Sequence, residues 1–283
     1  MAEYIFIAES GADIPQSEVK RLGIEIVPMH VTFASKSFDD GTFPAERIFD
    51  HYAATGELPA TSGCTPGDFT QVFDRLHQEH PEAHLVYLAY SAATTCSFES
   101  AHIAGEGRDY ITYIDTKSVC AGQYMVVAEV AQFAKDNPGC SVEDIKQKAL
   151  QCVAAIKMIF IPGELKFLRA GGRLSNAAFL GATLLHIKPV IEILDGRLVA
   201  TEKRRGSMER VVKAALQDFL TRHAMDHRRI AFIRNRGLPE KIQQMAEDMA
   251  LAEGFQEFVW IDTGCVISSH CGPGSFGVAA FEI

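Results

Sequence analysis

Hydroxyl residues are paired at two places in the first half of the chain. Thr61 and Ser62 stand side by side within TSGCTPGDF, and Thr95 and Ser97 flank Cys96 within YSAATTCSFESA. Neighbouring hydroxyls in a loop are often simple turn formers. They can also donate hydrogen bonds to an anion. The chemistry that they favour is recognition of a small negative group, such as a carboxylate.

One histidine near the C-terminus stands beside a rigid sequence. His270 and Cys271 precede Gly272-Pro273-Gly274, and we expect a turn there because glycine and proline favour turns. The turn would fix the direction of the imidazole and suit one chosen hydrogen-bond acceptor. A histidine that only caps a strand end is the simpler alternative. The G-x-G-x-x-G pattern over Gly272–Gly277 should not bind a dinucleotide, because a strand and not a helix follows it.

Arginine is concentrated in part of an otherwise acidic protein. The net charge is −9, which argues against a nucleic-acid partner. Yet the stretch from Lys166 to Lys213 holds ten Lys or Arg against four acidic residues, with Arg173 in RAGGRLS and Arg205 in KRRG. A solvated basic surface and a docking face for an acidic partner would both fit this pattern.

The composition is that of an ordinary globular protein. The chain has 283 residues, 47% hydrophobic and 22% charged, which suffices for two medium domains. No apolar run reaches the roughly 18 residues of a membrane span, and no basic region precedes the N-terminal apolar stretch. We therefore expect a cytoplasmic protein without stable membrane insertion. The seven cysteines are scattered without C-x-x-C, so we expect no metal site.

Apolar runs alternate with helical patterns in the first half, which is typical of a parallel sheet covered by helices. Strands are predicted at Tyr4–Ala8, Ile24–Val31, His84–Ala89 and Tyr110–Asp115. Two helix starts carry capping patterns, Thr65 with Asp68 and Ser141 with Asp144.

The second half predicts antiparallel pairing. Asp195-Gly196 between two apolar runs is a strong signal for a two-residue hairpin. The remaining predictions are helices Ser207–His223 and Pro239–Ala252 and strands Arg229–Asn235, Glu257–Ile261 and Phe276–Phe281. We therefore predict an α/β protein of two domains, a parallel-sheet domain over 1–157 and a mixed or antiparallel α/β domain over 158–283.

These motifs together resemble the DegV family of bacterial fatty-acid-binding proteins, the FakB type. TSGCTPGDF is similar to the family's TSQP and helix start, and YSAATTCSFESA to SSxLSGTYQSA. Gly171-Gly172-Arg173 matches its GGR signature, and His270 to Gly274 its HxGPG signature. The resemblance runs from Ile5 to the end of the chain. It implies a parallel α/β domain, a mixed α/β domain and a fatty acid between them.

The resemblance also implies roles for the matched residues. Those assigned to the fatty-acid carboxylate are Thr61, Ser62, Thr95 and His270, with Cys64, Cys96 and Ser97 as additional pocket contacts. Arg173 and Arg205 would dock a separate kinase. The chain departs from the family pattern at Gly63-Cys64 and at Cys96. Cys96 replaces a glycine, so it should add bulk where a backbone N–H approaches the ligand.

The function implied is that of a carrier and not of an enzyme. It would hold a long-chain fatty acid while a dihydroxyacetone-kinase-like subunit phosphorylates the carboxylate to an acyl phosphate for phospholipid synthesis. The chain has no P-loop and no acidic cluster for magnesium, so we expect no nucleotide site and no cofactor besides the bound lipid. The main alternative is a hydrolase or acyltransferase that uses His270 with a cysteine or serine nucleophile. A relative of dihydroxyacetone kinase is a third possibility.

Overall fold

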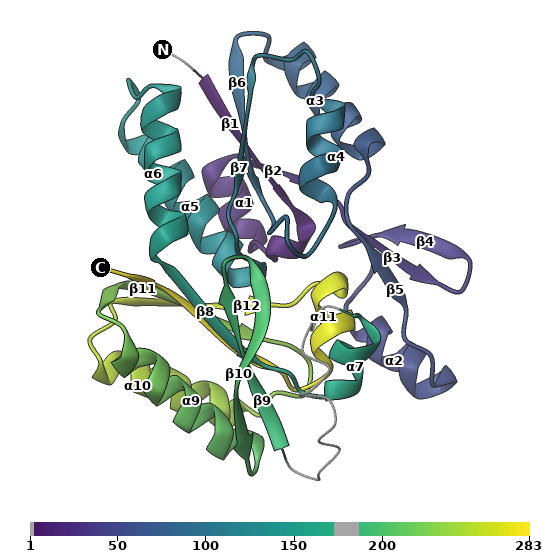
Figure 1. Cartoon of the computed structure of the whole chain (residues 1–283), viewed down its shortest axis with the longest axis vertical. Coiled ribbons are helices and arrows are strands. Elements are labelled where there is room, and N and C mark those ends of the chain that lie inside the picture. Colours follow the sequence, from purple (N-terminus) through teal and green to yellow (C-terminus); the bar gives the residue numbers. More distant parts are fainter. Residues whose placement is uncertain (1–2, 173–186) are drawn as a thin grey trace.

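The computed structural model describes residues 3–172 and 187–283. Its elements form two large β-sheets, one above the other in Figure 1, and a small sheet at the side of the molecule. This architecture confirms the predicted α/β fold, with one parallel and one mixed sheet.

The first large sheet is parallel throughout, in the order β2-β1-β6-β7. Its strands are β1 (Glu3–Glu9), β2 (Ile24–Val27), β6 (Ala83–Ala89) and β7 (Ile111–Asp115). The helices around it are α1 (Gln16–Leu22), α3 (Pro66–Glu79), α4 (Ser97–Ala104), α5 (Cys120–Asp136) and α6 (Val142–Ala155). Both predicted capping boxes are present, at Thr65 and Ser141. Each closes the first turn of its helix and sets where the preceding loop ends.

The small sheet was not predicted from the sequence. It is antiparallel in the order β4-β3-β5 and consists of β3 (His30–Phe33), β4 (Lys36–Asp39) and β5 (Ala60–Ser62), with η1 (Ser10–Ala12) and α2 (Glu46–Thr55) nearby. The prediction of one strand over Ile24–Val31 was wrong. The chain leaves the parallel sheet at Val27, because Pro28 has no N–H to continue the ladder, and β3 then begins another sheet.

The second large sheet is mixed, in the order β10-β9-β8-β13-β11-β12. Its strands are β8 (Ile156–Ile161), β9 (Ile187–Leu194), β10 (Arg197–Arg205), β11 (Met225–Arg234), β12 (Glu257–Asp262) and β13 (Phe276–Glu282). Among the described strands of this sheet, β11 and β12 are the one pair that runs in parallel. The helices of this half are α7 (Leu165–Ala170), α9 (Met208–Arg222), α10 (Glu240–Ala252) and α11 (Cys265–Cys271).

The predicted hairpin joins β9 to β10. Asp195 and Gly196 both have positive φ, at 46° and 78°, as a two-residue turn of this kind requires. The turn reaches the other half of the molecule, where the Ser91 hydroxyl donates a hydrogen bond of 2.7 Å to the carbonyl of Gly196. A side chain at Gly196 would collide with this hydroxyl.

Helix α5 connects the two large sheets. Eleven of its 17 residues are buried, and one hydrophobic cluster runs from Val86 in β6 through this helix to Ala279 in β13. The predicted domain division at 157/158 stays a prediction; α6 ends at Ala155, and the next strand, β8, belongs to the second large sheet. Within residues 3–172 and 187–283, no helix has the length and apolar character needed to cross a membrane.

Candidate functional site

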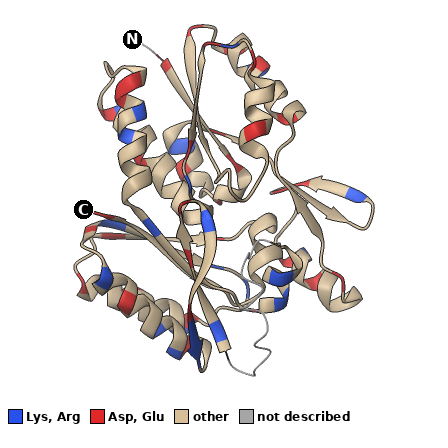
Figure 2. Ribbon diagram, in the orientation of Figure 1, with Lys and Arg blue, Asp and Glu red and all other residues tan. Residues whose placement is uncertain are grey.

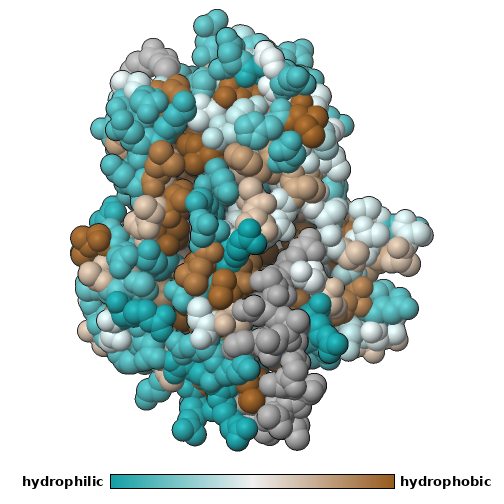
Figure 3. Space-filling model, in the orientation of Figure 1, coloured by the Kyte–Doolittle hydropathy of each residue, from teal (hydrophilic) through white to brown (hydrophobic). Residues whose placement is uncertain are grey.

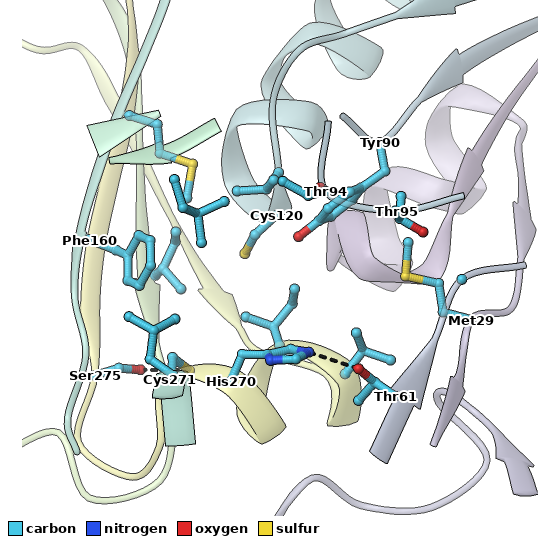
Figure 4. Close-up of a pocket in the computed structure, with 18 of the residues that line it drawn as sticks. Met29, Thr61, Tyr90, Thr94, Thr95, Cys120, Phe160, His270, Cys271 and Ser275 are labelled. Atoms are coloured by element: carbon cyan, nitrogen blue, oxygen red, sulfur yellow. Dashed lines mark hydrogen bonds between the residues drawn. The ribbon is translucent and has the colours of Figure 1, made fainter. Parts of the chain in front are cut away.

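A cavity lies between the two halves of the molecule. It holds about 800 Å³ of space between atoms, including its opening to solvent. Its walls are mostly apolar, with Phe160 across the cavity from Thr61 (Figure 4). Further apolar side chains come from α5, α7, α11, β8, β10, β11 and β13. Thr61, Thr94 and Thr95 place their hydroxyl groups on one side, whereas Ser275 lies on the opposite side, beside Cys271 (Figure 4).

The polar side brings together residues from distant parts of the sequence. Thr61 and Ser62 end β5, Thr95 precedes α4, and His270 lies in the last turn of α11; all four line the cavity. The Nε2 of His270 lies 2.8 Å from the Oγ1 of Thr61, within hydrogen-bond distance (Figure 4). Thr94 also lines the cavity, although its side chain donates to the Ser91 carbonyl at 2.9 Å. Thr94 was not predicted as a site residue, because no motif distinguishes it from Thr95 in the sequence.

The segment that carries His270 is a short helix, and the expected Gly-Pro-Gly turn follows it. Helix α11 spans Cys265–Cys271, a turn follows at Pro273-Gly274, and Gly272 and Gly274 have φ of +70° and +75°. The ring of His270 is therefore oriented by a helix packed in the interior. The turn was predicted, but the helix before it was not, because seven residues are too few to give a clear helical period.

Two carboxylates from the first half hold the start of α11. One Asp40 oxygen accepts hydrogen bonds from the N–H groups of Cys265 and Val266, at 2.9 and 3.4 Å. An Asp13 oxygen accepts from the N–H of Gly264 at 2.8 Å. Burial, with the nearby Asp40 charge, raises the pKa of Asp13 well above its ordinary value. The helix that carries His270 is thus capped by residues more than 200 positions earlier in the sequence.

The hydroxyl of Ser97 stands behind Thr95. The Ser97 Oγ lies 3.1 Å from the Thr95 Oγ1 and accepts a hydrogen bond from the N–H of Cys64 at 3.1 Å. The backbone of Gly63 lies against both hydroxyls, because a Cβ there would come within 2.2 Å of the Thr95 Oγ1 and 2.6 Å of the Ser97 Oγ. The departure at Gly63 therefore makes room for the Thr95 and Ser97 side chains.

Three residues expected to touch the pocket are not among the described residues that line it. Ser97 supports Thr95 from behind, and Cys64 is buried with its thiol 3.6 Å from the carbonyl of Val27. Cys96 is exposed at the start of α4. It is not among the described lining residues, and the expectation that it adds bulk beside the ligand stays a prediction.

Two other cysteines do line the cavity. Cys120 begins α5 with φ +43°, and its thiol donates to Asp13 at 3.1 Å. Cys271 ends α11 and lies near Ser275 (Figure 4). Burial raises the pKa of the Cys271 thiol to about 12 and that of Cys120 well above its ordinary value. Both are therefore protonated near neutral pH and act as weakly polar wall groups.

One of the two arginines expected to dock a kinase, Arg205, lies within the described residues. Arg173 lies outside the described residues. Arg205 is exposed at the end of β10. Figure 2 shows basic residues on α7 and at the lower ends of β9 and β10, on the same side of the molecule. By contrast, the neighbouring Arg204 forms ion pairs with Glu202 and Asp218.

Comparison of the sequence with known proteins gives matches over nearly the whole chain. The model of the family described as "Uncharacterised protein, DegV family" matches residues 5–282. A DegV domain-containing protein of Deinococcus radiodurans is 27% identical over 279 residues, with 96% of each chain covered. Another, from Caldanaerobacter subterraneus, is 25% identical over 282 residues, with 98% of each chain covered.

Solved structures of similar fold are also DegV family proteins. The fold is similar to that of a DegV family protein from Thermus thermophilus described with fatty acid binding, with a TM-score of 0.86 and 27% identity over 99% of this chain and 100% of that one. It also matches DegV of Bacillus subtilis, described as a fatty acid binding protein, with a TM-score of 0.83 and full coverage of both chains, although at 24% identity that likeness shows the fold alone. By sequence and by fold, this chain belongs to the DegV family.

Proposed function

We propose that the protein binds a long-chain fatty acid in the cavity, with the carboxylate at Thr61, Ser62, Thr95 and His270. The observation that carries the proposal is that Thr61, Thr95 and His270 lie together on one side of a cavity whose other walls are mostly apolar. The fatty-acid binding described for the Thermus thermophilus relative supports it.

The apolar walls suit the acyl chain. Burial of about 16 methylenes at roughly 0.8 kcal/mol each provides on the order of 12 kcal/mol before the cost of ordering the chain. A buried carboxylate without partners would cancel much of this gain. Hydroxyl and imidazole groups at one end can supply the hydrogen bonds that prevent this loss.

The polar side also suits presentation of the carboxylate to another protein. None of the described residues in the lining is Lys or Arg. A carboxylate held by hydroxyls and an imidazole keeps an oxygen that can attack a phosphoryl group. We propose that a separate dihydroxyacetone-kinase-like subunit supplies that group from ATP, and that Arg205 and Arg173 belong to its docking face.

A cysteine hydrolase is less well supported. The Nε2 of His270 is within hydrogen-bond distance of a threonine hydroxyl, and burial raises the pKa of Cys64, Cys120 and Cys271. A thiol with a raised pKa carries little thiolate at neutral pH, and thiolate is the nucleophilic form.

Mass spectrometry of an organic extract of the purified protein tests the proposed ligand. We expect close to one fatty acid per chain. An extract without fatty acid, together with no binding of added palmitate or oleate, would overturn the proposal. Acyl phosphate formation in a mixture with ATP and a fatty acid kinase subunit then tests the carrier role separately.

A further inference from the structure

A second hollow lies on the outside of the molecule, close to the cavity. It is a surface groove between α6, the start of β8 and the β9–β10 turn. Its apolar residues are Leu150, Val153, Ala154, Ile156, Met158, Ile193 and Leu194, and Lys117, Lys157, Glu192, Asp195 and His223 also line it. Leu150 and Leu194 are 61% and 43% exposed. Figure 3 shows apolar residues gathered at the waist of the molecule, where its two halves meet.

Met158 separates this groove from the cavity. It is the described residue that lines both. Alternate residues of a strand face the same side, so Ile156 in the groove, Met158 and Phe160 in the cavity form one apolar stripe along β8. The adjacent residues Ser118 and Val119 also lie at the boundary between the two hollows, since Ser118 lines the groove and Val119 lines the cavity.

At Gly122 the barrier consists of the flexible Met158 side chain together with the small Ser118 side chain, whose Oγ lies 1.9 Å from the position of a Cβ on Gly122. Met158 is 4% exposed, and its Sδ lies 3.2 Å from the position that a Cβ on Gly122 would occupy. No side chain of Gly122 therefore adds to the wall at this point. Methionine fills irregular gaps and is readily replaced by smaller or differently shaped side chains.

From this arrangement we infer that Met158 limits the length of the acyl chain, and that its removal joins the cavity to the outer groove. The inference rests on the proposed function. The occupant is the distal end of the protein's own fatty acid, because the stripe on β8 is continuous with the cavity that holds the rest of the chain. Thr61 and His270 line the cavity but not the groove, so the carboxylate remains inside.

Competition binding on delipidated protein tests the inference, with saturated fatty acids from myristic to behenic acid displacing a fluorescent fatty acid. For Met158→Ala, we expect affinity to rise about two- to fourfold per methylene beyond the length at which the unaltered protein levels off, since each methylene gains an apolar wall. Met158→Leu should keep the original profile. Met29→Ala is the matched control, because Met29 lies beside Thr61 and Thr95 (Figure 4) and lines the cavity but not the groove.

Leu194→Asp provides a test that does not depend on a change in the interior. In the Met158→Ala background, the charge in the groove should abolish the gain for long chains, while Leu194→Asp alone should leave every affinity unchanged. A profile of Met158→Ala equal to that of Met29→Ala would overturn the inference. Weaker long-chain binding in Leu194→Asp alone would also overturn it, because the chain would then already pass Met158. If no variant and not even the unaltered protein binds any fatty acid, the proposed function itself fails.

Discussion

Replacement of Asp40 by alanine should loosen the helix that carries His270. The Asp40 side chain is buried and accepts hydrogen bonds from the N–H groups of Cys265 and Val266 and from the Ser10 hydroxyl, the last at 2.8 Å. In Asp40→Ala, the two N–H groups lose their cap and the hydroxyl loses a charged acceptor. The start of α11 then keeps only the hydrogen bonds of Gly264 to Asp13 and of the Cys265 thiol to the Phe43 carbonyl as ties to the first half of the molecule.

The expected magnitude follows from these contacts. Loss of a helix cap costs about 1–2 kcal/mol, and loss of a hydrogen bond to a charged group costs about 1.5–3 kcal/mol. We expect a decrease of about 3 kcal/mol in the free energy of unfolding, which lowers the melting temperature by roughly 6–12 °C in a protein of this size.

Thermal unfolding followed by circular dichroism on delipidated protein measures the effect. The matched control is Asp39→Ala, which removes the neighbouring carboxylate, 55% exposed and 3.0 Å from the Nδ1 of His30. An exposed pair of this kind contributes less than about 1 kcal/mol. Because α11 supplies Val266 and His270 to the cavity, Asp40→Ala should also weaken fatty-acid binding. Equal melting temperatures for the two variants would refute the view that Asp40 holds this helix.

Three further predictions concern the site and its surroundings. Gly63→Ala should displace the Thr95 and Ser97 hydroxyls and lower the free energy of unfolding by about 1–3 kcal/mol. The control Gly67→Ala, in the first turn of α3, should be neutral or slightly stabilising. Urea unfolding distinguishes the two variants, and equal midpoints would contradict the close contact at Gly63. Asp13 has a raised folded-state pKa, so its contribution to stability is complete below about pH 4 and is lost as the pH rises through that raised value. The stability of Asp13→Asn relative to the unaltered protein should therefore increase with pH, and a difference that is constant with pH would show that Asp13 is ionised in the folded state. Arg205→Glu should reduce acyl phosphate formation by the kinase while fatty-acid binding is retained. The control Arg197→Glu, at the other end of β10, should affect neither. Loss of lipid binding in Arg205→Glu would show that Arg205 supports the fold or the pocket and does not only dock the kinase.

The elements that could be predicted are those with local signals. Short apolar runs predicted the strands of the parallel sheet, except that β2 ends earlier than expected, and the capping boxes at Thr65 and Ser141 predicted two helix starts. Asp195-Gly196 gave the hairpin because its conformation depends on two adjacent residues.

The features that were missed depend on contacts between distant residues. Helix α11 could not be predicted because the carboxylate that caps it, on Asp40, stands 225 residues before Cys265. The contact of Gly63 with Thr95 and Ser97 joins two motifs that look independent in the sequence. Cys120 lines the cavity because α5 begins there, and no recognisable motif surrounds this residue in the sequence.

Carboxylate recognition at the Thr61–His270 side is the central claim, and comparison of a fatty acid with the primary alcohol of the same chain length tests it most directly. Both ligands fill the apolar walls equally, so the difference in affinity reports on the head group. We predict that the acid binds about 10- to 150-fold more tightly to delipidated protein, the range that corresponds to about 1.5–3 kcal/mol for a hydrogen bond to a charged group. In Thr61→Val this preference should shrink. Equal affinities for the acid and the alcohol in the unaltered protein would contradict the account.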